Sequence, residues 1–475
     1  RTLLASDKVR WVGEPVAAIV AETAAQAADA AEMVFVDVEF LPTLVDIEEA
    51  LASDTVIYES AGSNSVFDTT VVGMPDNTPT DEYFSGCEVV VSGRFLNQRV
   101  APCPLEVRGS AATWVDGRLY QWLSTQHAQG VKTPIAAANG VEPDVVRVIT
   151  PDVGGAFGAK IGTYAEEMLL GPISKALGRP VRWRETRSES MMCLGHGRAQ
   201  LQHVTIGGTR DGKVTHYQLH LLQDAGAFAD VGGILRVAMT RPMVSAVYDI
   251  PNVECRATTV VTHTTPTVPY RGAGRPEATA AAERAMDLFA AENGKDPAEV
   301  RRINLIPKFL EPHATAIGHS YDVGDFEGAL DKALEAAGYT GLRAEQARRR
   351  AEGGDKQLGI GVSVYVEITG GVDPMGEAAK IEVQPDGSAL VYTGTSPHGQ
   401  GHDTSWSMIA SDQTGIPIDR ITLVWGDTDL VPEGGGTMGS RSLQVGGTAV
   451  NKAAIELVEK AQKLAASLLE ADEAD

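Results

Sequence analysis

The sequence predicts an α/β (α+β) protein built from several domains. The chain has 475 residues, and domains often contain about 150 residues, so its length allows roughly three of them. Hydrophobic residues make up 43% of the chain, which is typical of globular proteins with buried cores. Short β-branched runs alternate with alanine-rich amphipathic runs along most of the sequence. This alternation indicates strands and helices that follow one another in an α/β arrangement.

The composition excludes several classes of function. A net charge of −23 leaves little basic surface for the phosphates of nucleic acids or for anionic membranes. The chain has no apolar run of 18 residues, so we predict no membrane span. Its four cysteines include no Cys-x-x-Cys pair, which disfavours a zinc or iron–sulfur site on this chain. Sparse cysteine also predicts a cytoplasmic protein.

The first 85 residues predict a small unit followed by a linker. Within residues 1–50, two predicted strands at 16–21 and 34–40 flank a helix at 24–33. Residues 51–85 are polar and rich in turn-forming side chains, so we interpret them as a linker or wrapping arm.

Two larger α/β domains are predicted over residues 86–310 and 311–475. Their strands are expected at 89–95, 117–123, 145–149, through 181–225, and at 358–368, 378–383 and 389–392. Their helices are expected as a turn at 136–139 and as longer helices at 164–177, 278–292, 342–352, 403–413 and 449–469.

Four glycine-rich loops lie at predicted strand–helix junctions, at residues 152–160, 269–277, 398–404 and 434–442. Glycine lets backbone N–H groups approach an anion closely, and a helix N-terminus adds a positive potential. Arg271 and Arg275 add guanidinium groups that suit an anion. The first loop is not a Walker phosphate loop, because Lys160 is not followed by Ser or Thr. Together, the loops predict a large polyanionic cofactor clamped between domains.

One of these loops contains two histidines in a spacing that can also bind a metal. His398 and His402 are four residues apart, as metal-binding histidines on one helical face are. Gly399 and Gly401 lie between them and disfavour a helix through this stretch. We therefore expect the loop to cradle phosphate through its backbone, with no metal held by protein side chains.

The order and content of the loops resemble the molybdenum-binding large subunit of the xanthine dehydrogenase, aldehyde oxidase and aerobic carbon monoxide dehydrogenase family. The resemblance covers essentially the whole chain. It implies a partial hammerhead-like N-terminal domain followed by two molybdopterin-binding α/β domains, the second incomplete at its C-terminus. The segments that carry it are V-G-E-P-V-A-A-I-V-A at 12–21, Ser124-Thr125-Gln126, the loops 154–158, 271–275, 399–401 and 437–442, and Asp296-Pro297 with Arg301 and Asn304-Leu305.

The resemblance implies molybdenum held by the dithiolene of a molybdopterin cofactor, in its cytosine dinucleotide form. It implies catalytic roles for Gln126, which would hydrogen-bond the oxo ligand, for Phe157, whose backbone would approach the metal with that of Gly158, and for Arg271, which would lie beside it. The other cofactor-binding residues implied by the resemblance are Gly154, Gly155, Gly399, Gln400, Gly401, His402, Thr437, Gly439, Ser440 and Ser442.

The reaction implied by the resemblance is hydroxylation of an electron-poor carbon with oxygen from water. Electrons would pass to a small subunit with [2Fe-2S] clusters and a medium subunit with FAD, in a dimer of heterotrimers. Gly272 stands where copper-containing carbon monoxide dehydrogenases have cysteine, and Ile161 stands where purine-oxidising members have glutamate. We therefore expect an aldehyde or an aromatic N-heterocycle as the small-molecule substrate.

Three alternatives remain open. The chain could be a carbon monoxide dehydrogenase-like large subunit despite Gly272, or a non-catalytic molybdopterin carrier or assembly subunit. A glycine-rich sugar-nucleotide binder is disfavoured, because no G-x-G-x-x-G follows the first strand.

The resemblance also places a catalytic glutamate late in the second cofactor domain, beyond the helix at 449–469. We therefore expect the 475-residue chain to be catalytically incomplete by itself. Glu14 is assigned a structural role, while Glu277 and Asp403 are expected to cap helices or to orient Arg271 and the cofactor.

Overall fold

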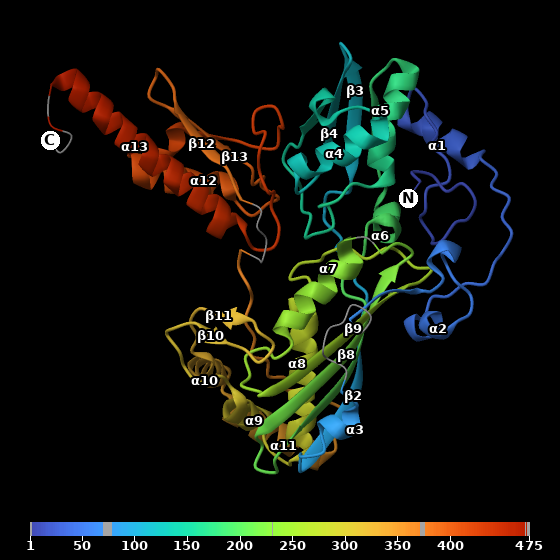
Figure 1. Ribbon diagram of the computed structural model, residues 1–475, viewed down its shortest axis with the longest axis vertical. Coiled ribbons are helices and arrows are strands. Elements are labelled where there is room, and N and C mark those ends of the chain that lie inside the picture. Colours follow the sequence, from blue (N-terminus) through green and yellow to red (C-terminus); the bar gives the residue numbers. More distant parts are fainter. Residues whose placement is uncertain (1, 70–77, 230, 371–375, 471, 473–475) are drawn as a thin grey trace. The chain divides into compact units, whose positions relative to one another are not determined.

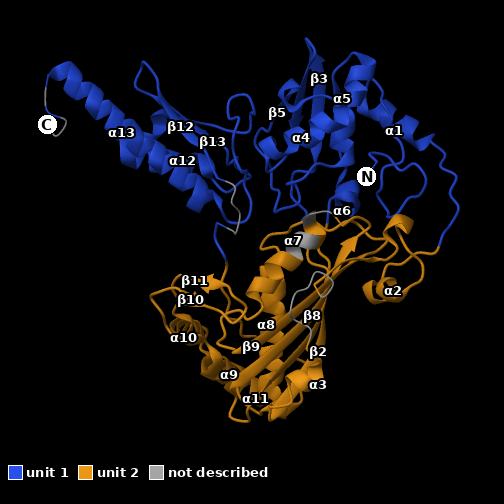
Figure 2. Cartoon of the chain, viewed as in Figure 1, with its two compact units in different colours: residues 1–41, 101–195, 368–475 blue, residues 42–100, 196–367 orange. Residues whose placement is uncertain are grey.

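Figure 1 shows the computed structural model of the chain, which describes residues 2–69, 78–229, 231–370, 376–470 and 472. The chain divides into two compact units (Figure 2). Unit 1 comprises residues 1–41, 101–195 and 368–475, and unit 2 comprises residues 42–100 and 196–367. Each unit is therefore assembled from segments that lie far apart in the sequence.

One part of unit 1 is a four-stranded sheet packed against helices. Its elements are β3 (Gly109–Val115), β4 (Arg118–Leu123), β5 (Val146–Ile149), β6 (Val181–Arg184), α4 (Ala128–Asn139), η2 (Pro143–Val145), α5 (Ala165–Leu177) and α6 (Arg187–Cys193). The strand order is β5-β4-β3-β6, with β4 and β5 parallel. Asp116 and Gly117 both have positive φ angles and make the tight turn between β3 and β4. Leu119, Ile135 and Leu170 belong to the core between this sheet and its helices.

A second, three-stranded sheet occupies the C-terminal part of unit 1. Its elements are β12 (Ala379–Val383), β13 (Ala389–Thr393), α12 (His402–Thr414), η4 (Ile418–Arg420), β14 (Ile421–Val424), the π-helical turn η5 (Ser442–Gly447) and α13 (Thr448–Leu469). β12 and β13 are antiparallel, whereas β13 and β14 are parallel and joined through α12. Val391, Trp406 and Val450 form the core between the sheet and its helices. α1 (Ala24–Glu32) completes unit 1, with a capping box between Thr23 and Gln26.

Unit 2 is built on a five-stranded sheet in the order β1-β9-β8-β7-β2. The strands are β1 (Ser65–Asp68), β2 (Val89–Asn97), β7 (Gln200–Gly208), β8 (Val214–Gly226) and β9 (Asn252–Val261). The helices and short strands are α2 (Ile47–Ala52), η1 (Glu59–Ala61), α3 (Thr80–Tyr83), α7 (Val231–Thr240), η3 (Arg241–Met243), α8 (Arg275–Glu292), α9 (Pro297–Asn304), β10 (His313–Ala314), β11 (Ser320–Tyr321), α10 (Phe326–Ala337) and α11 (Tyr339–Glu352). The long helix α8 packs against β2 and β7 through its alanine-rich face (Figure 1).

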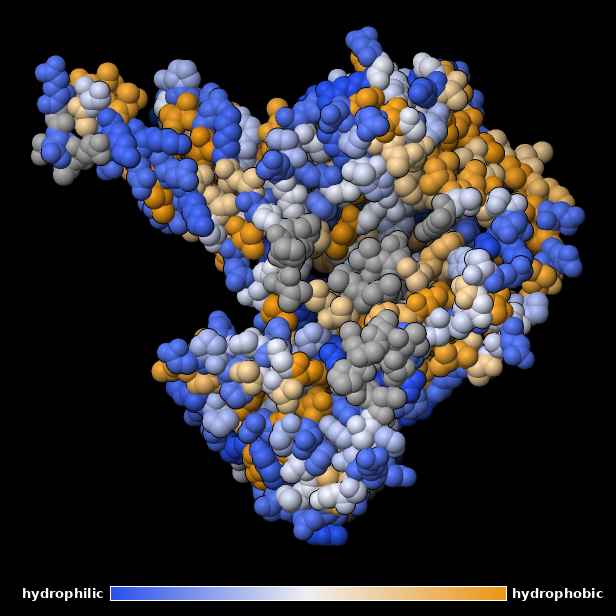
Figure 3. Space-filling model, in the orientation of Figure 1, coloured by the Kyte–Doolittle hydropathy of each residue, from blue (hydrophilic) through white to orange (hydrophobic). Residues whose placement is uncertain are grey.

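The predicted mixed α/β fold is confirmed, but three predicted strands do not form. Residues 16–21, 34–40 and 358–368 form neither helix nor strand and have no strand partners in the described parts of the chain. Their β-branched pattern is real, yet a strand forms only when a neighbour supplies hydrogen bonds. Phe35 and Phe40 are exposed, and hydrophobic side chains gather over this N-terminal segment on the face shown in Figure 3.

The linker interpretation of residues 51–85 also needs correction. Residues 65–68 form β1, which pairs with β9 at one edge of the sheet in unit 2. Asn64 fixes the preceding turn, because its side chain donates to the Ala50 and Thr55 carbonyls and accepts from the Ile57 N–H. Polar turn-forming residues therefore position a strand here. Helix α10 also forms near the start of the second predicted domain, where no helix is predicted before residue 342.

None of the helices in the described part of the chain combines the length and apolar content needed to cross a bilayer.

A buried ion-pair network ties α8 to α9 in unit 2. Arg301 is fully buried, and its Nε lies 2.8 Å from Glu283 Oε2 while its Nη2 lies 2.9 Å from Asp287 Oδ1. The Tyr248 hydroxyl donates to the other Glu283 oxygen at 2.5 Å. Asn304 bonds the Val214 N–H and the Gly212 carbonyl. The Asp296-to-Asn304 motif is therefore structural.

We predict that Arg301→Ala lowers the free energy of unfolding by about 3–5 kcal/mol, because it leaves the buried Glu283 carboxylate and the partly exposed Asp287 carboxylate without their cation. The matched control is Arg302→Ala, which removes an adjacent arginine that is 40% exposed and pairs with Asp331; it should cost only about 0–1 kcal/mol. Urea unfolding followed by circular dichroism compares the two. Equal costs would contradict the assignment.

Candidate functional site

The candidate site lies in unit 1, where two pairs of parallel strands end. β4 and β5 form one pair, and β13 and β14 form the other. The carboxyl ends of parallel strands meet at one edge, where α/β proteins commonly bind ligands. The two sheets are joined there, because the Thr150 N–H donates to the Gly426 carbonyl at 2.7 Å and the Thr428 N–H donates to the Val148 carbonyl at 3.0 Å. The loops that follow these strands include three of the four predicted glycine loops.

Gln126 is the point at which loops from both sheets meet. Its side chain is 5% exposed. Oε1 accepts from the Gly158 N–H at 2.8 Å and more weakly from the Lys160 N–H at 3.4 Å, while Nε2 donates to the Thr437 carbonyl at 2.8 Å. The Gln126 backbone bonds the same two loops, with its N–H on the Lys160 carbonyl and its carbonyl accepting from Thr437. These partners fix the orientation of the amide and leave one Nε2 hydrogen for a further acceptor.

The residues on either side of Gln126 extend this contact. His127 Nε2 lies 3.2 Å from the Gly434 carbonyl, and His398 Nε2 lies 3.3 Å from the Thr125 carbonyl. Burial lowers the pKa of His398 to about 4, so the ring is neutral at pH 7 and donates through Nε2. The Thr125-Gln126-His127 turn therefore contacts all three glycine loops of unit 1.

The first glycine loop has an unusual backbone. Gly155, Phe157 and Gly158 have φ angles of 99°, 56° and 102°. Phenylalanine rarely adopts this left-handed region, and its ring here is 41% exposed. Such a conformation costs about 1–3 kcal/mol and persists only where the surroundings enforce it. Here it directs the Gly158 N–H to Gln126.

The loop at 434–442 is braced by a buried ion pair. Arg441 Nη1 lies 2.6 Å from Glu377 Oε2 and donates to the Gly436 carbonyl at 2.9 Å. Glu377 also accepts from the Gly435 N–H at 3.2 Å. A Cβ at Gly435 would lie 2.5 Å from the Arg441 guanidinium, so this brace requires glycine. The arginine and the glycines thus act as one structural unit.

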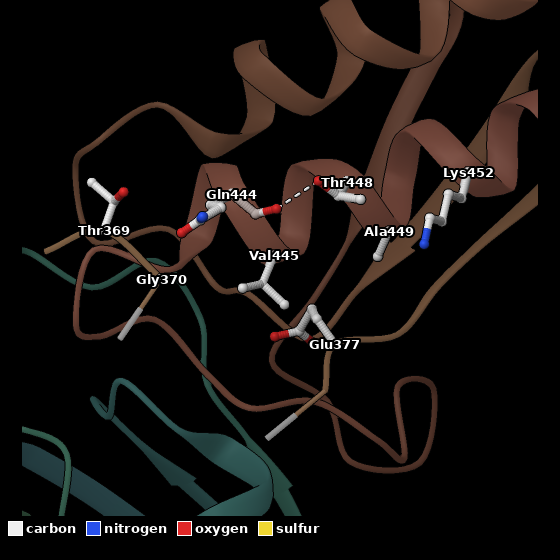
Figure 4. Close-up of a pocket in the computed structure, with 8 residues that line it drawn as sticks. All are labelled: Thr369, Gly370, Glu377, Gln444, Val445, Thr448, Ala449 and Lys452. Atoms are coloured by element: carbon white, nitrogen blue, oxygen red, sulfur yellow. Dashed lines mark hydrogen bonds between the residues drawn. The ribbon is translucent and has the colours of Figure 1, made fainter. Parts of the chain in front are cut away.

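A pocket of about 460 Å³ adjoins this ion pair (Figure 4). It is lined by Thr369, Gly370, Glu377, Gln444, Val445, Thr448, Ala449 and Lys452. None of the site residues predicted from the sequence lines it. The pocket follows the π-helical turn η5 and the start of α13, where the Thr448 hydroxyl donates to the Gln444 carbonyl at 2.5 Å.

The third loop presents open backbone. Among the described residues, nothing lies within 4 Å of a Cβ added at Gly399 or Gly401 in this loop, or at Gly439 in the 434–442 loop. The space beside the backbone at these three positions is therefore open to a ligand. His402 is the first residue of α12, stacks on Trp406 and contacts the Thr395 carbonyl. His398 precedes that helix, so the two histidines do not share a helical face. No group of three or more His, Cys, Asp or Glu side chains among the described residues could hold a metal ion.

The predicted residues of unit 1 therefore occupy one region of loops. Gln126 is in direct contact with Gly158 and Thr437. The remaining predicted residues lie on the same three loops or at the helix starts that follow them: Gly154, Gly155, Phe157, Gly399, Gln400, Gly401, His402, Gly439, Ser440 and Ser442. Among them, Gln400 Oε1 accepts from the His398 N–H at 2.5 Å.

Arg271 belongs to unit 2, so the structure relates it only to its neighbours there. Arg198 donates to the carbonyls of Tyr270 at 3.0 Å and of Arg271 at 2.7 Å. Glu277 accepts from the Gly274 N–H at 2.8 Å and so caps α8, as predicted. No partner for the Arg271 side chain is found among the described residues.

Sequence reasoning missed the residues that support these loops. Arg198, Glu106, Lys160, Glu377 and Arg441 carry no motif of their own. The one available signal is that Lys160 and Arg441 stand within the glycine loops as cations in an otherwise acidic chain. Glu14 accepts from the Arg10 N–H at 2.7 Å, a local structural contact, and Asp403 lies in the first turn of α12.

Comparison with known proteins gives matches along the whole chain. Two molybdopterin cofactor-binding domain families match residues 58–305 and 332–475. The carbon monoxide dehydrogenase large chain of Hydrogenophaga pseudoflava is 35% identical, over 100% of this chain and 62% of that protein. The nicotine 6-hydroxylase large subunit of Paenarthrobacter nicotinovorans is 33% identical, over 100% of this chain and 59% of that protein.

Solved structures also match this chain over its whole length. Quinoline 2-oxidoreductase from Pseudomonas putida 86 superposes with a TM-score of 0.93 at 31% identity, over 100% of this chain and 61% of that one. Reconstituted carbon monoxide dehydrogenase from Oligotropha carboxidovorans gives 0.90 at 32% identity, over 100% and 63%. The chain thus spans about three-fifths of the length of these proteins.

The close approach of the two sheets gives a test. A Cβ at Gly436 would lie 2.7 Å from the Gln126 carbonyl oxygen and 2.9 Å from His127 Cβ. We predict that Gly436→Ala destabilises unit 1 by about 1–3 kcal/mol more than Gly387→Ala, because overpacking adds to backbone strain. Gly387 has a similar φ, 81° against 72°, but no atom closer than 3.9 Å. All six tryptophans lie in unit 1, so their fluorescence reports its unfolding in urea. An equal loss in both variants would contradict the prediction.

Proposed function

The chain belongs to the molybdopterin cofactor-binding family of molybdenum-binding large subunits, and we propose that it forms the cofactor-binding part of a molybdenum hydroxylase. The proposed reaction is oxidative hydroxylation of an aldehyde or an aromatic N-heterocycle with oxygen derived from water. The observation that carries the proposal is the Gln126 amide, which is fixed by Gly158 and Thr437 and retains one hydrogen. That hydrogen can stabilise an oxygen atom on which negative charge develops.

The loops of unit 1 suit the dinucleotide form of the cofactor. We propose that its phosphates and pterin are bound by the backbone at 399–402 and 437–442, together with the side chains of His402, Thr437, Ser440 and Ser442. Phe157 and its flanking glycines 154, 155 and 158 would line the side that faces the metal. When bound, the cofactor supplies a molybdenum centre that accepts two electrons from the substrate. The fit rests on the open backbone at Gly399, Gly401 and Gly439 and on the buried Ser124 hydroxyl, which has no hydrogen-bond partner among the described residues.

Unit 2 contributes Arg271 to the proposal. Arg198 holds the carbonyl of Arg271, so the loop is fixed through its backbone while the guanidinium remains available for an anion. We propose that Arg271 lies beside the metal when the complete site is assembled.

Gly272 and the names of the relatives support the proposed substrate class. Gly272 has a φ of 92°, and a Cβ there would lie 2.6 Å from Pro276 Cγ. Glycine offers no thiolate to hold copper at this position, which argues against copper-dependent carbon monoxide oxidation. By their names, relatives act on nicotine and quinoline, both N-heterocycles. The similarity to carbon monoxide dehydrogenase keeps that activity as the second candidate.

We further propose the assembly that the family resemblance implies: a medium subunit with FAD, a small subunit with [2Fe-2S] clusters, and a dimer of these heterotrimers in the cytoplasm. Residues 1–50 would form part of a hammerhead-like domain, and residues 86–310 and 311–475 would form the two cofactor domains. A carrier without catalysis is the alternative. It would be favoured if the complete assembly bound molybdenum without oxidising any substrate in an aldehyde, N-heterocycle and carbon monoxide screen.

Replacing Gln126 tests its role. We predict that Gln126→Ala and the isosteric Gln126→Glu retain molybdenum in the complete assembly but lower kcat by roughly 10²-fold, as loss of one oxyanion donor does. The control is Gln129→Ala, because Gln129 also bonds the 425–441 loop, at Val431, but lies one helical turn away. Metal analysis and steady-state kinetics compare the three. A near wild-type kcat in both Gln126 variants would rule out the role.

The cofactor itself provides a second test. Acid hydrolysis of the purified assembly should release a cytosine nucleotide in proportion to the molybdenum content, because three loops offer backbone N–H groups that suit the phosphates of a dinucleotide and the family resemblance implies cytosine as its base. Mass spectrometry of the released nucleotide and metal analysis are the measurements. Full activity in molybdenum-free protein would refute the proposal, and release of a different nucleotide would refute the cytosine form.

A further inference from the structure

Glu106 and Lys160 form an ion pair against the first glycine loop. Lys160 Nζ lies 2.8 Å from Glu106 Oε2 and donates to the Glu106 carbonyl at 3.0 Å. The lysine side chain is 1% exposed, and burial lowers its pKa while the bond to Glu106 opposes that shift. A buried ammonium is costly even when it is paired. Its presence here therefore calls for a role beyond stability.

The pair joins the two ends of the loop. At the start, Glu106 Oε2 accepts from the Gly154 N–H at 2.9 Å, and the Glu106 N–H donates to the Gly154 carbonyl at 3.1 Å. A Cβ at Gly154 would lie 2.6 Å from Glu106 Cβ, so glycine permits this approach. At the other end is Lys160 itself. One carboxylate oxygen thus binds residue 154 directly and residue 160 through its ammonium.

We call this Glu106–Lys160 ion pair, which joins the two ends of the 154–160 loop, the clamp. Lys160 also connects the clamp to Gln126. Its carbonyl accepts from the Gln126 N–H at 2.8 Å and from the Thr125 hydroxyl at 3.0 Å, and its N–H points to Gln126 Oε1 at 3.4 Å. Side chain and backbone of one residue therefore link Glu106 to the amide that carries the proposed function.

The segment between the clamped ends contains the strained backbone. Phe157 and Gly158 are both left-handed, and the Gly158 N–H must point at Gln126 for the amide to be fixed. A phenylalanine in this region needs surroundings that enforce it. Tyr164, whose hydroxyl donates to the Ala159 carbonyl at 2.7 Å, holds only the later part of the loop. The clamp is the contact that fixes both ends together.

We infer that Glu106 and Lys160 are positioning residues that set the shape of the 154–160 loop and, through it, the orientation of the Gln126 amide. The inference rests on the proposed function. Neither side chain touches the reacting atoms. Their effect is exerted through the Gly158 N–H and the Lys160 backbone.

The first readout needs neither cofactor nor activity. Hydrogen exchange of the cofactor-free assembly is followed by mass spectrometry in peptides that cover 154–160. Lys160→Met and Glu106→Gln should each speed exchange there on the order of 10-fold, because the loop opens locally, while peptides from α12 and α13 stay unchanged. The control is Arg147→Met, which breaks a comparable ion pair with Asp427 in the same unit and should leave the 154–160 peptides unchanged.

The second readout separates positioning from simple destabilisation. In the loaded assembly, both variants should lower kcat with little change in KM, and Glu106→Asp should recover part of the loss because it retains the charge. The double variant Glu106→Gln/Lys160→Met should be no worse than the worse single variant, since the two side chains act as one unit.

Unchanged exchange at 154–160 in Lys160→Met, or an equal rise throughout unit 1, would overturn the inference. The proposed function fails separately. If the loop loosens in the clamp variants but Gln126→Ala retains full turnover, the clamp stands and the role of Gln126 falls. If Gln126→Ala loses turnover while the clamp variants behave like wild type, the role of Gln126 stands and the positioning role of the clamp falls.

Discussion

The hydrogen bonds of the Gln126 amide are the contacts on which the candidate site depends. They join the loop that follows β5 to the loop that follows β14, so that loops from two separate sheets are held together. Each such bond contributes only about 1 kcal/mol net, yet an unpaired amide or carbonyl in this buried position would cost more than that. The loops therefore have one arrangement in which all partners are satisfied. A fixed donor at the meeting point is the consequence.

Glycine-rich loops gain close backbone approach at the expense of conformational freedom lost on folding. In unit 1, an ion pair packs against each of two such loops and helps to hold its conformation. Glu377 and Arg441 brace residues 434–442, and Glu106 and Lys160 brace residues 154–160. Replacing a buried ion pair with apolar residues is often neutral for stability, whereas removing one partner leaves an uncompensated charge. The position of the two ion pairs under the two loops that bond Gln126 indicates that geometry, more than stability, is what they provide.

Local signals in the sequence predict the elements but not the contacts that make the site. The helices at 24–33 and 164–177 and the strand at 89–95 follow from signals within a few residues, and the structure confirms them as α1, α5 and β2. Residues 16–21 and 34–40 have the same local signals and form no ladder, because pairing depends on a neighbour that the pattern cannot specify. Gln126 and Thr437 are 311 positions apart. No periodicity connects them, so only the resemblance to the molybdenum-binding large subunits singles out Gln126.

The acidity of the chain constrains how it can hold an anion. With a net charge of −23, the long-range field repels a phosphate, but at physiological ionic strength that repulsion is screened beyond about 8 Å. Binding must therefore depend on groups in direct contact. Backbone N–H groups of glycine-rich loops can contact an anion directly, without a basic patch of side chains. Within unit 2 the same logic applies to Arg271, because Arg198 satisfies the carbonyl of its loop and leaves one guanidinium to act at short range.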